Sequence, residues 1–363
     1  MSLGNKKLRY GIIGSGMMGR EHIRNLLAID NCEVVAICDS HEPSLVAASR
    51  LLPEAKLFEN YQDLLDAAEL AIDVVVIATP NHTHLDVLND VLKTGLHVLV
   101  EKPLCTTVKD CQLAIDRDKQ THRDGRVVWV GLEYRYMAPT ARLLSEVGSG
   151  TCGKVRMVAI REHRFPFLEK VDNWNRFTTN TGGTLVEKCC HFFDVMGLIA
   201  QSRAVRVFAS GEQDVNHLDE IYDGQRSDIL DNAFVIVDYQ NGVRGMLDLS
   251  MFAEGSKNEQ EISVVGSNAK IEALITESKI RIGLRANGAT GVEEFVVEQP
   301  HGVVAGFHSG ASYLEHLAMQ RAIRTGSPSM VTLQDGLDSV AVGQAAHISI
   351  SQKRVVEISE LFI

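Results

Sequence analysis

The stretch Leu8-Arg9-Tyr10-Gly11-Ile12-Ile13-Gly14-Ser15-Gly16-Met17-Met18-Gly19 joins an apolar segment to a glycine-rich turn and decides the fold of the first third of the chain. The apolar segment is typical of a buried strand, and the residues after the turn predict a helix from about Met17 to Ile29. Between a strand and a helix, G-x-G-x-x-G gives a tight turn, room for a pyrophosphate and close packing of helix on strand. The helix N-terminus then favours phosphate. The residues expected at a dinucleotide here are Gly14, Gly16, Met17, Met18 and Gly19.

A second predicted strand, Glu33 to Cys38, ends in Asp39, twenty residues beyond Gly19. An acid at this place accepts hydrogen bonds from the ribose of adenosine and repels a 2′-phosphate. No arginine directly follows Asp39 to attract such a phosphate. We therefore expect NAD rather than NADP as the cofactor. The alternative is that Asp39 is an ordinary acid at a strand end or a helix N-cap.

Short apolar strands alternate with helices as far as residue 131. The predicted strands are 56–58, 73–78, 97–100 and 127–131, and the predicted helices are 61–68, 87–94 and 108–120. This alternation predicts a doubly wound parallel sheet, which binds ligands at the carboxyl ends of its strands. The further residues expected at the cofactor are Thr79, Pro80, Asn81, His84, Glu101 and Lys102. For His84, a helix-start histidine without a ligand is the alternative.

The second half of the chain has a different pattern. The predicted strands are 154–165, 205–211, 261–266, 271–274, 279–284 and 293–298, with a hairpin over 232–252, and the predicted helices are 313–324 and 334–351. The hairpin turns at Asn241-Gly242, the strongest two-residue hairpin signal. Consecutive strands with short turns predict an open, mostly antiparallel sheet. The fold class is therefore α/β, with a Rossmann domain over 1–133 and an α+β domain over 134–363.

Composition narrows the possible partners and the compartment. A chain of 363 residues with 45% hydrophobic residues is typical of two globular domains. The formal charge of −11 argues against nucleic acid or an anionic membrane surface as a partner. No apolar run is long enough to span a bilayer, and the N-terminus has no signal-peptide pattern. Seven cysteines without a CxxC motif favour a reducing, cytoplasmic setting.

A predicted helix from Thr184 to about Ala200 carries a candidate acid–base pair. Thr184 fits the N-cap position, and Glu187 three residues later completes a capping-box pattern. Glu187 and His191 are four residues apart and so share a face. In acid–base chemistry the carboxylate holds one ring nitrogen while the other moves a proton. The alternatives are that Glu187 only caps the helix, that the two form a solvated surface pair, or that His191 is a satisfied core histidine.

Several motifs follow the glycine-rich turn in a definite order. They are Ala78-Thr79-Pro80-Asn81 with His84, Glu101-Lys102-Pro103-Leu104, Tyr134-Arg135-Tyr136, and Gly182-Gly183-Thr184-Leu185 followed by His191 and Asp194. This order resembles the Gfo/Idh/MocA family of oxidoreductases, which includes glucose–fructose oxidoreductase and inositol 2-dehydrogenase. The resemblance covers essentially the whole chain. It implies an NAD(P)-dependent dehydrogenase that acts on a CH–OH group of a sugar, an inositol or a related polyol.

The resemblance also implies roles for particular residues. The lysine of the family's Glu-Lys-Pro motif corresponds to Lys102, which would reach the reacting oxygen, and a cis peptide bond is implied before Pro103. The family's Asp-x-x-x-His pair corresponds to Glu187 and His191, so this chain has glutamate where aspartate is usual. Lys102 and His191 could exchange roles in proton transfer. The family's open sheet commonly forms an oligomer interface, which implies a homodimer or homotetramer.

Four other residues are candidates for substrate binding, each with an alternative. Trp174 would stack on a sugar ring or pack in the core. Tyr134 and Arg135 begin the second domain, and Arg135 would otherwise tie the domains together. Asp194 would touch substrate or join helix to sheet. We expect no metal site, because adjacent cysteines such as Cys189 and Cys190 rarely chelate one ion together.

Other functions remain open on the same scaffold. Fold alone does not determine function, so a non-catalytic NAD(P)-binding sensor or regulator is one alternative. An aldose–aldose oxidoreductase with tightly held NADP is another, although Asp39 argues against it. A third is a reductase of a non-sugar carbonyl or imine.

Overall fold

The computed structural model describes residues 6–300, 302–303, 306 and 308–362, and the chain forms two compact units. The first unit comprises Met1–Glu133, Lys170–Trp174 and Gly302–Leu337. The second unit comprises Tyr134–Glu169, Asn175–His301 and Asp338–Ile363. One boundary thus falls between residues 133 and 134, where we expected the domains to meet. However, two segments that we expected in the second domain group with the first unit. They are residues 170–174 and 302–337.

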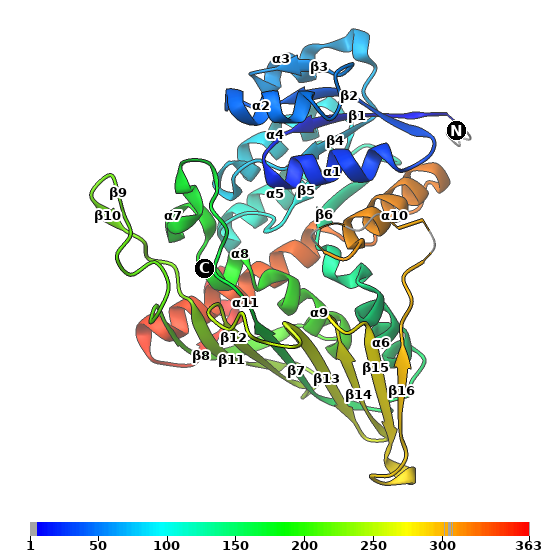
Figure 1. Cartoon of the computed structure of the whole chain (residues 1–363), viewed down its shortest axis with the longest axis vertical. Coiled ribbons are helices and arrows are strands. Elements are labelled where there is room, and N and C mark those ends of the chain that lie inside the picture. The colour runs from blue at the N-terminus through cyan, green and yellow to red at the C-terminus, as the bar shows by residue number, and fades with distance from the viewer. Residues whose placement is uncertain (1–5, 301, 304–305, 307, 363) are drawn as a thin grey trace. The chain divides into compact units, whose positions relative to one another are not determined.

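The sheet of the first unit is a six-stranded parallel sheet with the order β3-β2-β1-β4-β5-β6 (Figure 1). Its strands are β1 (Leu8–Ile13), β2 (Cys32–Cys38), β3 (Lys56–Phe58), β4 (Val74–Ile77), β5 (His97–Glu101) and β6 (Val128–Gly131). The strand order reverses between β1 and β4, and ligands bind at this kind of switch point. All residues of β4 are buried, as expected for a strand covered by helices on both faces. The prediction of a doubly wound sheet is confirmed.

The helices of this sheet connect its parallel strands. They are α1 (Met17–Leu27), α2 (Glu42–Ser49), α3 (Tyr61–Asp66), α4 (His84–Thr94) and α5 (Val108–Gln120), with short 3₁₀ turns η1 (Ala68–Leu70) and η2 (Asn81–Thr83). The helix α5 has the predicted bounds, whereas α2 was not predicted. The helix α4 begins at His84 rather than at Val87, because η2 leads directly into it. It ends at Thr94, and its C-cap is Gly95, which has a φ of 84°.

The helix α10 (Ala311–Thr325) belongs to the first unit, although the sequence suggested that everything after residue 134 is one domain. Buried polar side chains on α10 bond to the Rossmann core. Glu315 Oε1 accepts a hydrogen bond of 3.1 Å from Trp129 Nε1, and His316 Nε2 lies 2.9 Å from His22 Nδ1. These partners are far apart in sequence, so no local pattern could reveal them.

The second unit is built on a nine-stranded sheet with the order β16-β15-β14-β13-β7-β12-β11-β8-β17. Its strands are β7 (Val155–His163), β8 (Ala204–Glu212), β11 (Asn232–Tyr239), β12 (Arg244–Ser250), β13 (Gln260–Gly266), β14 (Ala269–Leu274), β15 (Lys279–Leu284), β16 (Val292–Val296) and β17 (Val356–Glu357). All neighbouring pairs are antiparallel except β7 and β12, which are parallel. A separate ribbon pairs β9 (Ile221–Tyr222) with β10 (Gln225–Arg226).

The hairpin of β11 and β12 confirms the predicted turn but not its length. Asp238 pairs with Arg244, and Tyr239 N donates to Val243 O at 3.0 Å, so the loop has three residues, 240–242. Gly242 has a φ of 84°, while Asn241 keeps a negative φ. A three-residue loop needs only one left-handed residue, which the glycine provides.

Helices cover one face of the nine-stranded sheet and leave the other exposed. The remaining helices and turns are η3 (Glu133–Tyr136), α6 (Ala138–Gly148), η4 (Val171–Arg176), α7 (Thr178–Thr181), α8 (Thr184–Glu187), α9 (Cys190–Ala200), η5 (Arg285–Asn287), α11 (Leu333–Gln352) and η6 (Ile358–Phe362). The helix α6 packs on β14 and β15, and α9 packs on β7. Along β11, Val235 and Val237 are buried and Phe234 and Ile236 are exposed, so the strand alternates between the two faces. No helix in the described ranges is long and apolar enough to cross a bilayer.

Candidate active site

The turn between β1 and α1 is closely packed on one side and open on the other. Gly14 has a φ of 90°, and a Cβ there would lie 2.5 Å from the carbonyl oxygen of Ala78. A Cβ on Gly19 would lie 1.9 Å from Gly14 O, so neither position accepts a side chain. A Cβ on Gly16, in contrast, would meet no atom within 4 Å. This open side leads to Met17, the first residue of α1, and it suits the pyrophosphate of a dinucleotide.

Asp39, at the carboxyl end of β2, supports the glycine-rich turn from the side. Its Oδ2 accepts hydrogen bonds from Ser15 N (2.7 Å) and Ser15 Oγ (3.0 Å), and its Oδ1 accepts one from His41 N (2.9 Å). A carboxylate has about four lone-pair sites, so Oδ1 retains one for a ribose hydroxyl. The residues present therefore fit NAD.

Replacing Asp39 by alanine is expected to relax the preference for NAD. The ratio of kcat/KM for NADP to that for NAD should rise about tenfold, which corresponds to ~1.4 kcal/mol, because the charge that repels a 2′-phosphate is lost. Asp39→Asn is the matched variant, since the amide oxygen still accepts from Ser15 but the charge is gone. Steady-state kinetics with both cofactors measure this ratio, and an unchanged ratio in both variants would contradict the ribose contact.

The carboxyl end of β4 presents Thr79, Pro80 and Asn81 in an ordered turn. Thr83 Oγ1 donates to Pro80 O at 2.7 Å and also bonds to Thr79 Oγ1 at 2.8 Å, which holds the turn in shape. The side chain of Asn81 is buried, and its Nδ2 meets no hydrogen-bond acceptor among the residues that the structure describes. A buried amide with a spare donor fits the expected position beside the nicotinamide ribose.

His84, expected at the cofactor, instead braces two strand ends. Its ring is fully buried, with Nδ1 2.8 Å from Pro103 O and Nε2 3.0 Å from Thr79 O. Burial lowers the pKa of His84, and a neutral ring donates through only one nitrogen, so one of these two contacts at a time is a full hydrogen bond. Both ring nitrogens already face backbone carbonyls, which leaves neither of them directed at a cofactor. This arrangement favours the alternative of a histidine without a ligand.

The carboxyl end of β5 delivers Glu101, Lys102 and Pro103. The Lys102–Pro103 peptide bond is cis, as expected. Glu101 was expected at the cofactor, but its buried carboxylate bonds within the protein. Its Oε1 lies 2.8 Å from His22 Nε2, and its Oε2 accepts a hydrogen bond of 3.1 Å from Lys102 N. Glu101 therefore fixes the backbone of Lys102, and His22 is a residue that the sequence patterns did not single out.

The helix predicted from Thr184 to Ala200 is two helices, α8 and α9, with a break at Lys188 and Cys189. The predicted capping box is wrong. Thr184 is the first helical residue, and its hydroxyl donates to Leu230 O at 2.6 Å. The N-cap is Gly183, where a Cβ would lie 2.4 Å from His347 Nε2. The same nitrogen of His347 accepts a hydrogen bond of 3.1 Å from Leu185 N, so it caps the start of α8 from a distant helix.

Glu187 and His191 are both buried in the second unit, which excludes a solvated surface pair. Glu187 ends α8 and His191 lies in the first turn of α9. The His191 ring stacks on the ring of Tyr134, with centroids 3.9 Å apart and an angle of 5° between the planes. A parallel aromatic neighbour at this distance sets the plane of the imidazole. Tyr134, expected to bind substrate, therefore contacts the candidate base.

Arg135 and Asp194, two further candidates for substrate binding, bond to each other within the second unit. Arg135 Nε donates to Asp194 Oδ2 at 2.7 Å and Nη2 donates to Oδ1 at 2.5 Å, which is a bidentate ion pair. Both side chains are largely buried. The ion pair joins α9 to the segment that contains Tyr134. It therefore has a structural role in connecting these two elements.

Trp174 groups with the first unit and lies near His82. The ring centroids are 6.4 Å apart in an edge-on arrangement, and Trp174 is only partly buried. Asp172 and Asn173 before it have φ values of 52° and 51°. The partly exposed ring of Trp174 remains a candidate surface for a substrate ring, beside the alternative of core packing.

A further question for the described part of the chain is whether it contains clusters of side chains that bind metals. No group of three or more histidine, cysteine, aspartate or glutamate side chains there could hold an ion. The seven cysteines are all buried free thiols, and burial raises the pKa of Cys38 to about 12.

Two protein-family models match the chain in succession. One describes an oxidoreductase family with an NAD-binding Rossmann fold and matches residues 8–132. The other describes the C-terminal alpha/beta domain of the same Gfo/Idh/MocA oxidoreductase family and matches residues 145–358. Together they cover both halves of the chain.

Named relatives agree with these matches. Myo-inositol 2-dehydrogenase from Thermotoga maritima is 27% identical over 357 residues, which is 98% of this chain and 99% of that protein. Inositol 2-dehydrogenase from Salmonella typhimurium is 34% identical over 191 residues, about half of each chain. Among solved structures, a probable dehydrogenase from Thermotoga maritima is 26% identical with a TM-score of 0.78, over 98% of this chain and 100% of that one. Levoglucosan dehydrogenase in complex with NADH and levoglucosan has a TM-score of 0.85 over 97% of this chain and 99% of that one, and at 18% identity this likeness concerns the fold.

Proposed function

The chain belongs to the Gfo/Idh/MocA family of NAD-binding oxidoreductases, and we propose that it transfers a hydride between NAD and a secondary alcohol of an inositol, a sugar or a related polyol. The main support for this proposal comes from the residues at the carboxyl ends of the parallel strands in the first unit. There the turn at Gly16 is open, Asp39 has a spare acceptor and Asn81 has a spare donor. These three features suit the pyrophosphate and the two riboses of NAD.

We assign the acid–base chemistry to His191, Glu187 and Lys102. Bound NAD supplies the hydride acceptor, so the protein must remove the proton of the alcohol. A neutral His191 takes this proton, which a positioned base accelerates by about 10² to 10⁴. Glu187 sets the tautomer of the ring, and Lys102 stabilises the negative charge that develops on the oxygen.

The names of similar proteins indicate a class of substrate for this chain. Three of the four proteins named above have a substrate in their names: an inositol 2-dehydrogenase from each of two bacteria, and a levoglucosan dehydrogenase that is similar in fold. These substrates are cyclic polyols or anhydrosugars. Trp174 beside His82 offers a partly exposed aromatic face, which suits the apolar face of such a ring. We therefore propose a cyclic polyol or sugar as the substrate, with Trp174 as a contact.

The test of this function is NADH production at 340 nm across a panel of inositols, aldoses, sugar acids and their phosphates, with NAD and NADP in parallel. We expect a signal with one class of polyol and with NAD. If no compound in the panel gives NADH production while NAD still binds tightly, the result would instead support the sensor or the reductase of a non-sugar carbonyl.

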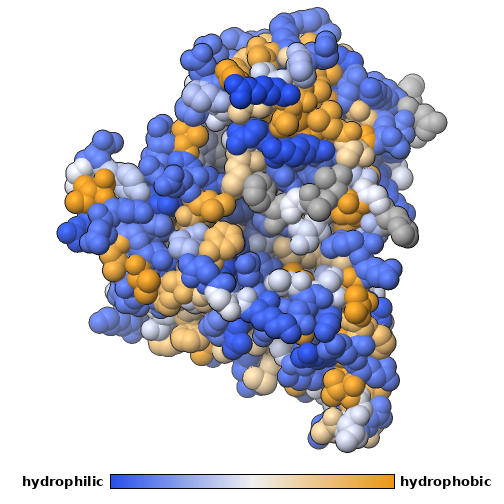
Figure 2. Space-filling view, in the orientation of Figure 1, coloured by the Kyte–Doolittle hydropathy of each residue, from blue (hydrophilic) through white to orange (hydrophobic). Residues whose placement is uncertain are grey.

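We also propose that the open face of the nine-stranded sheet pairs with a second copy of the chain. Phe208, Ile236 and Met246 lie in register on β8, β11 and β12 and are 43, 49 and 41% exposed. Further hydrophobic residues interrupt the hydrophilic surface over β15 and β16 (Figure 2). An apolar row on a sheet face that no helix covers is typical of an interface.

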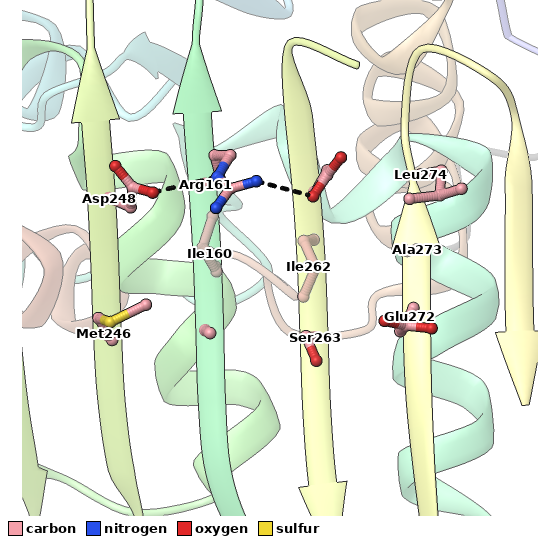
Figure 3. A pocket seen from close by; sticks show the side chains of 11 residues that line it. Ile160, Arg161, Met246, Asp248, Ile262, Ser263, Glu272, Ala273 and Leu274 are labelled. Carbon is pink, nitrogen blue, oxygen red and sulfur yellow. Dashed lines mark hydrogen bonds and ion pairs between the residues drawn. The ribbon is translucent and has the colours of Figure 1, made fainter. Parts of the chain in front are cut away.

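Charged residues beside this apolar row are compatible with a two-fold symmetric interface. A shallow pocket on the same face is lined by Arg161, which bonds to Asp248 at 3.0 Å and lies 3.6 Å from Glu261 (Figure 3). In a two-fold interface a surface meets its own copy, and a surface with both signs of charge avoids net repulsion. We propose a homodimer, or a homotetramer built from it. The buried thiols also fit a reducing cytoplasm.

Ile236→Lys is expected to dissociate this assembly, because it places a charge within the apolar row. Sedimentation velocity at micromolar concentration should detect a smaller particle than for the unmodified protein. Leu57→Lys on β3 is the control, since Leu57 is 43% exposed against 49% for Ile236, and it should leave the assembly intact. Sedimentation of the unmodified protein as a single chain would contradict the proposal.

A further inference from the structure

A buried ion pair lies within the second unit beside the candidate base. Lys188 Nζ is 2.9 Å from Glu162 Oε1, and both side chains are almost inaccessible to solvent. Burial lowers the pKa of Lys188, and the Glu162 carboxylate opposes that shift. Arg164 Nη1 also donates to Glu162 Oε1 at 3.3 Å. Moving two charges out of water is costly, and an apolar pair of similar volume often stabilises a protein as well. Stability alone therefore does not explain why a charged pair is buried here.

The ion pair holds the hydroxyl of Tyr134. Lys188 Nζ donates to Tyr134 Oη at 2.7 Å, and Gln260 Nε2 donates to the same oxygen at 3.2 Å. Lys188 reaches this oxygen from the break between α8 and α9, and Gln260 from the start of β13. Two donors from different elements leave the phenol ring of Tyr134 little freedom to rotate away.

The fixed phenol ring in turn faces the imidazole of His191. The two rings are parallel, with centroids 3.9 Å apart, and the ring of Phe192 packs edge-on against Tyr134 at 5.5 Å. Lys188 Nζ also lies 5.2 Å from the Tyr134 ring centroid and 5.6 Å from that of Phe192. A continuous chain of contacts therefore runs from Glu162 through Lys188 and Tyr134 to His191.

We propose that Glu162, Lys188 and Tyr134 are positioning residues that hold the His191 ring in one orientation for proton transfer; this inference rests on the function proposed above. A proton moves efficiently only when the ring nitrogen points at the alcohol oxygen. A misplacement of about 1 Å in such a group costs up to ~10² in rate. Lys188 lies at the break between α8 and α9, and its buried ammonium group reaches the Tyr134 hydroxyl from there.

Three variants separate positioning from packing. Tyr134→Leu removes the ring that stacks on His191, and Tyr134→Phe keeps that ring but removes its link to Lys188. Glu162→Gln combined with Lys188→Met neutralises both buried charges together, because Lys188→Met alone would leave the Glu162 carboxylate without its lysine. The control neutralises a pair on α6 that is closer to solvent, Arg142→Met with Glu146→Gln, whose side chains are 47 and 17% exposed.

We expect kcat for the polyol identified in the panel to fall at least tenfold in Tyr134→Leu and in the double variant. KM should stay within about twofold, Tm should stay near that of the unmodified protein, and Tyr134→Phe should have an intermediate kcat. A kcat within twofold of the unmodified protein in both Tyr134→Leu and the double variant, at unchanged Tm, would overturn the proposal.

A second measurement does not depend on turnover. In protein with ¹³C-labelled histidine, the His191 ring-proton signals, assigned with His191→Asn, should be displaced upfield by the Tyr134 ring. They should move back in Tyr134→Leu and spread or shift in the double variant. Signals that are the same in the unmodified protein and in Tyr134→Leu would overturn the proposal. If no polyol is oxidised, the proposed function fails, while this measurement still decides the positioning.

Discussion

Replacing Lys102 by alanine is expected to remove nearly all turnover while NAD still binds. Lys102 follows β5, and its backbone is held by Glu101, which is itself held by His22. The alanine variant keeps this backbone and loses the side chain beyond Cβ, including the ammonium group that we place at the reacting oxygen. Removal of one such charge-stabilising donor costs about 10² to 10³ in kcat. Stopped-flow kinetics and fluorescence titration with NADH would measure the two properties separately.

The control for this variant is Lys109→Ala, an exposed lysine on α5. It loses the same charge from the same unit and should leave both kcat and NAD affinity unchanged. Loss of NAD binding in Lys102→Ala would contradict our assignment, because the lysine would then belong to the cofactor site and not to the reacting oxygen.

His191→Ala is expected to lower kcat by about 10² to 10⁴ with little change in NAD affinity. The reason is the loss of a base whose plane is set by Tyr134. Imidazole added to the solution should restore part of the activity of this variant and none of that of Lys102→Ala. Steady-state rates with and without imidazole measure this difference. They also decide which of the two residues transfers the proton.

His122→Asn serves as the control for the histidine, because His122 is exposed at the end of α5. Its kcat should equal that of the unmodified protein. Rescue of Lys102→Ala by alkylamines, together with a His191→Ala variant that retains activity, would reverse the roles and make the lysine the base.

Local sequence patterns predicted the first unit well because its structure is specified locally. The glycines of the turn, the apolar strands and the caps each act within a few residues, so the parallel sheet and the places of Asp39 and Asn81 at strand ends followed from general rules. The bounds of α5 were predicted to the residue. Such agreement is expected where local preference and tertiary structure favour the same conformation.

The sequence did not predict contacts between distant segments. Thr184 and Glu187 match a capping box, but His347 on α11 and the carbonyl of Leu230 decide how α8 begins. The apolar spacing over 184–200 predicts one helix, yet the helix is interrupted at Lys188 and Cys189, where Lys188 pairs with the distant Glu162. Likewise the assignment of α10 to the first unit depends on His22 and Trp129. A charged residue in a helical pattern is normally predicted to face water, so no local signal identified Lys188.

The discontinuity of the first unit affects how the protein is made. A ribosome completes β6 at Gly131 long before it reaches α10 at Ala311. Until then, the nascent Rossmann sheet lacks the partners that His316 and Glu315 offer to His22 and Trp129. Both of these side chains are fully buried in the finished protein. The N-terminal domain therefore cannot be completed during synthesis in the order of its sequence. The incomplete sheet must wait for the C-terminal part of the chain, and chaperones have a surface to bind during this interval.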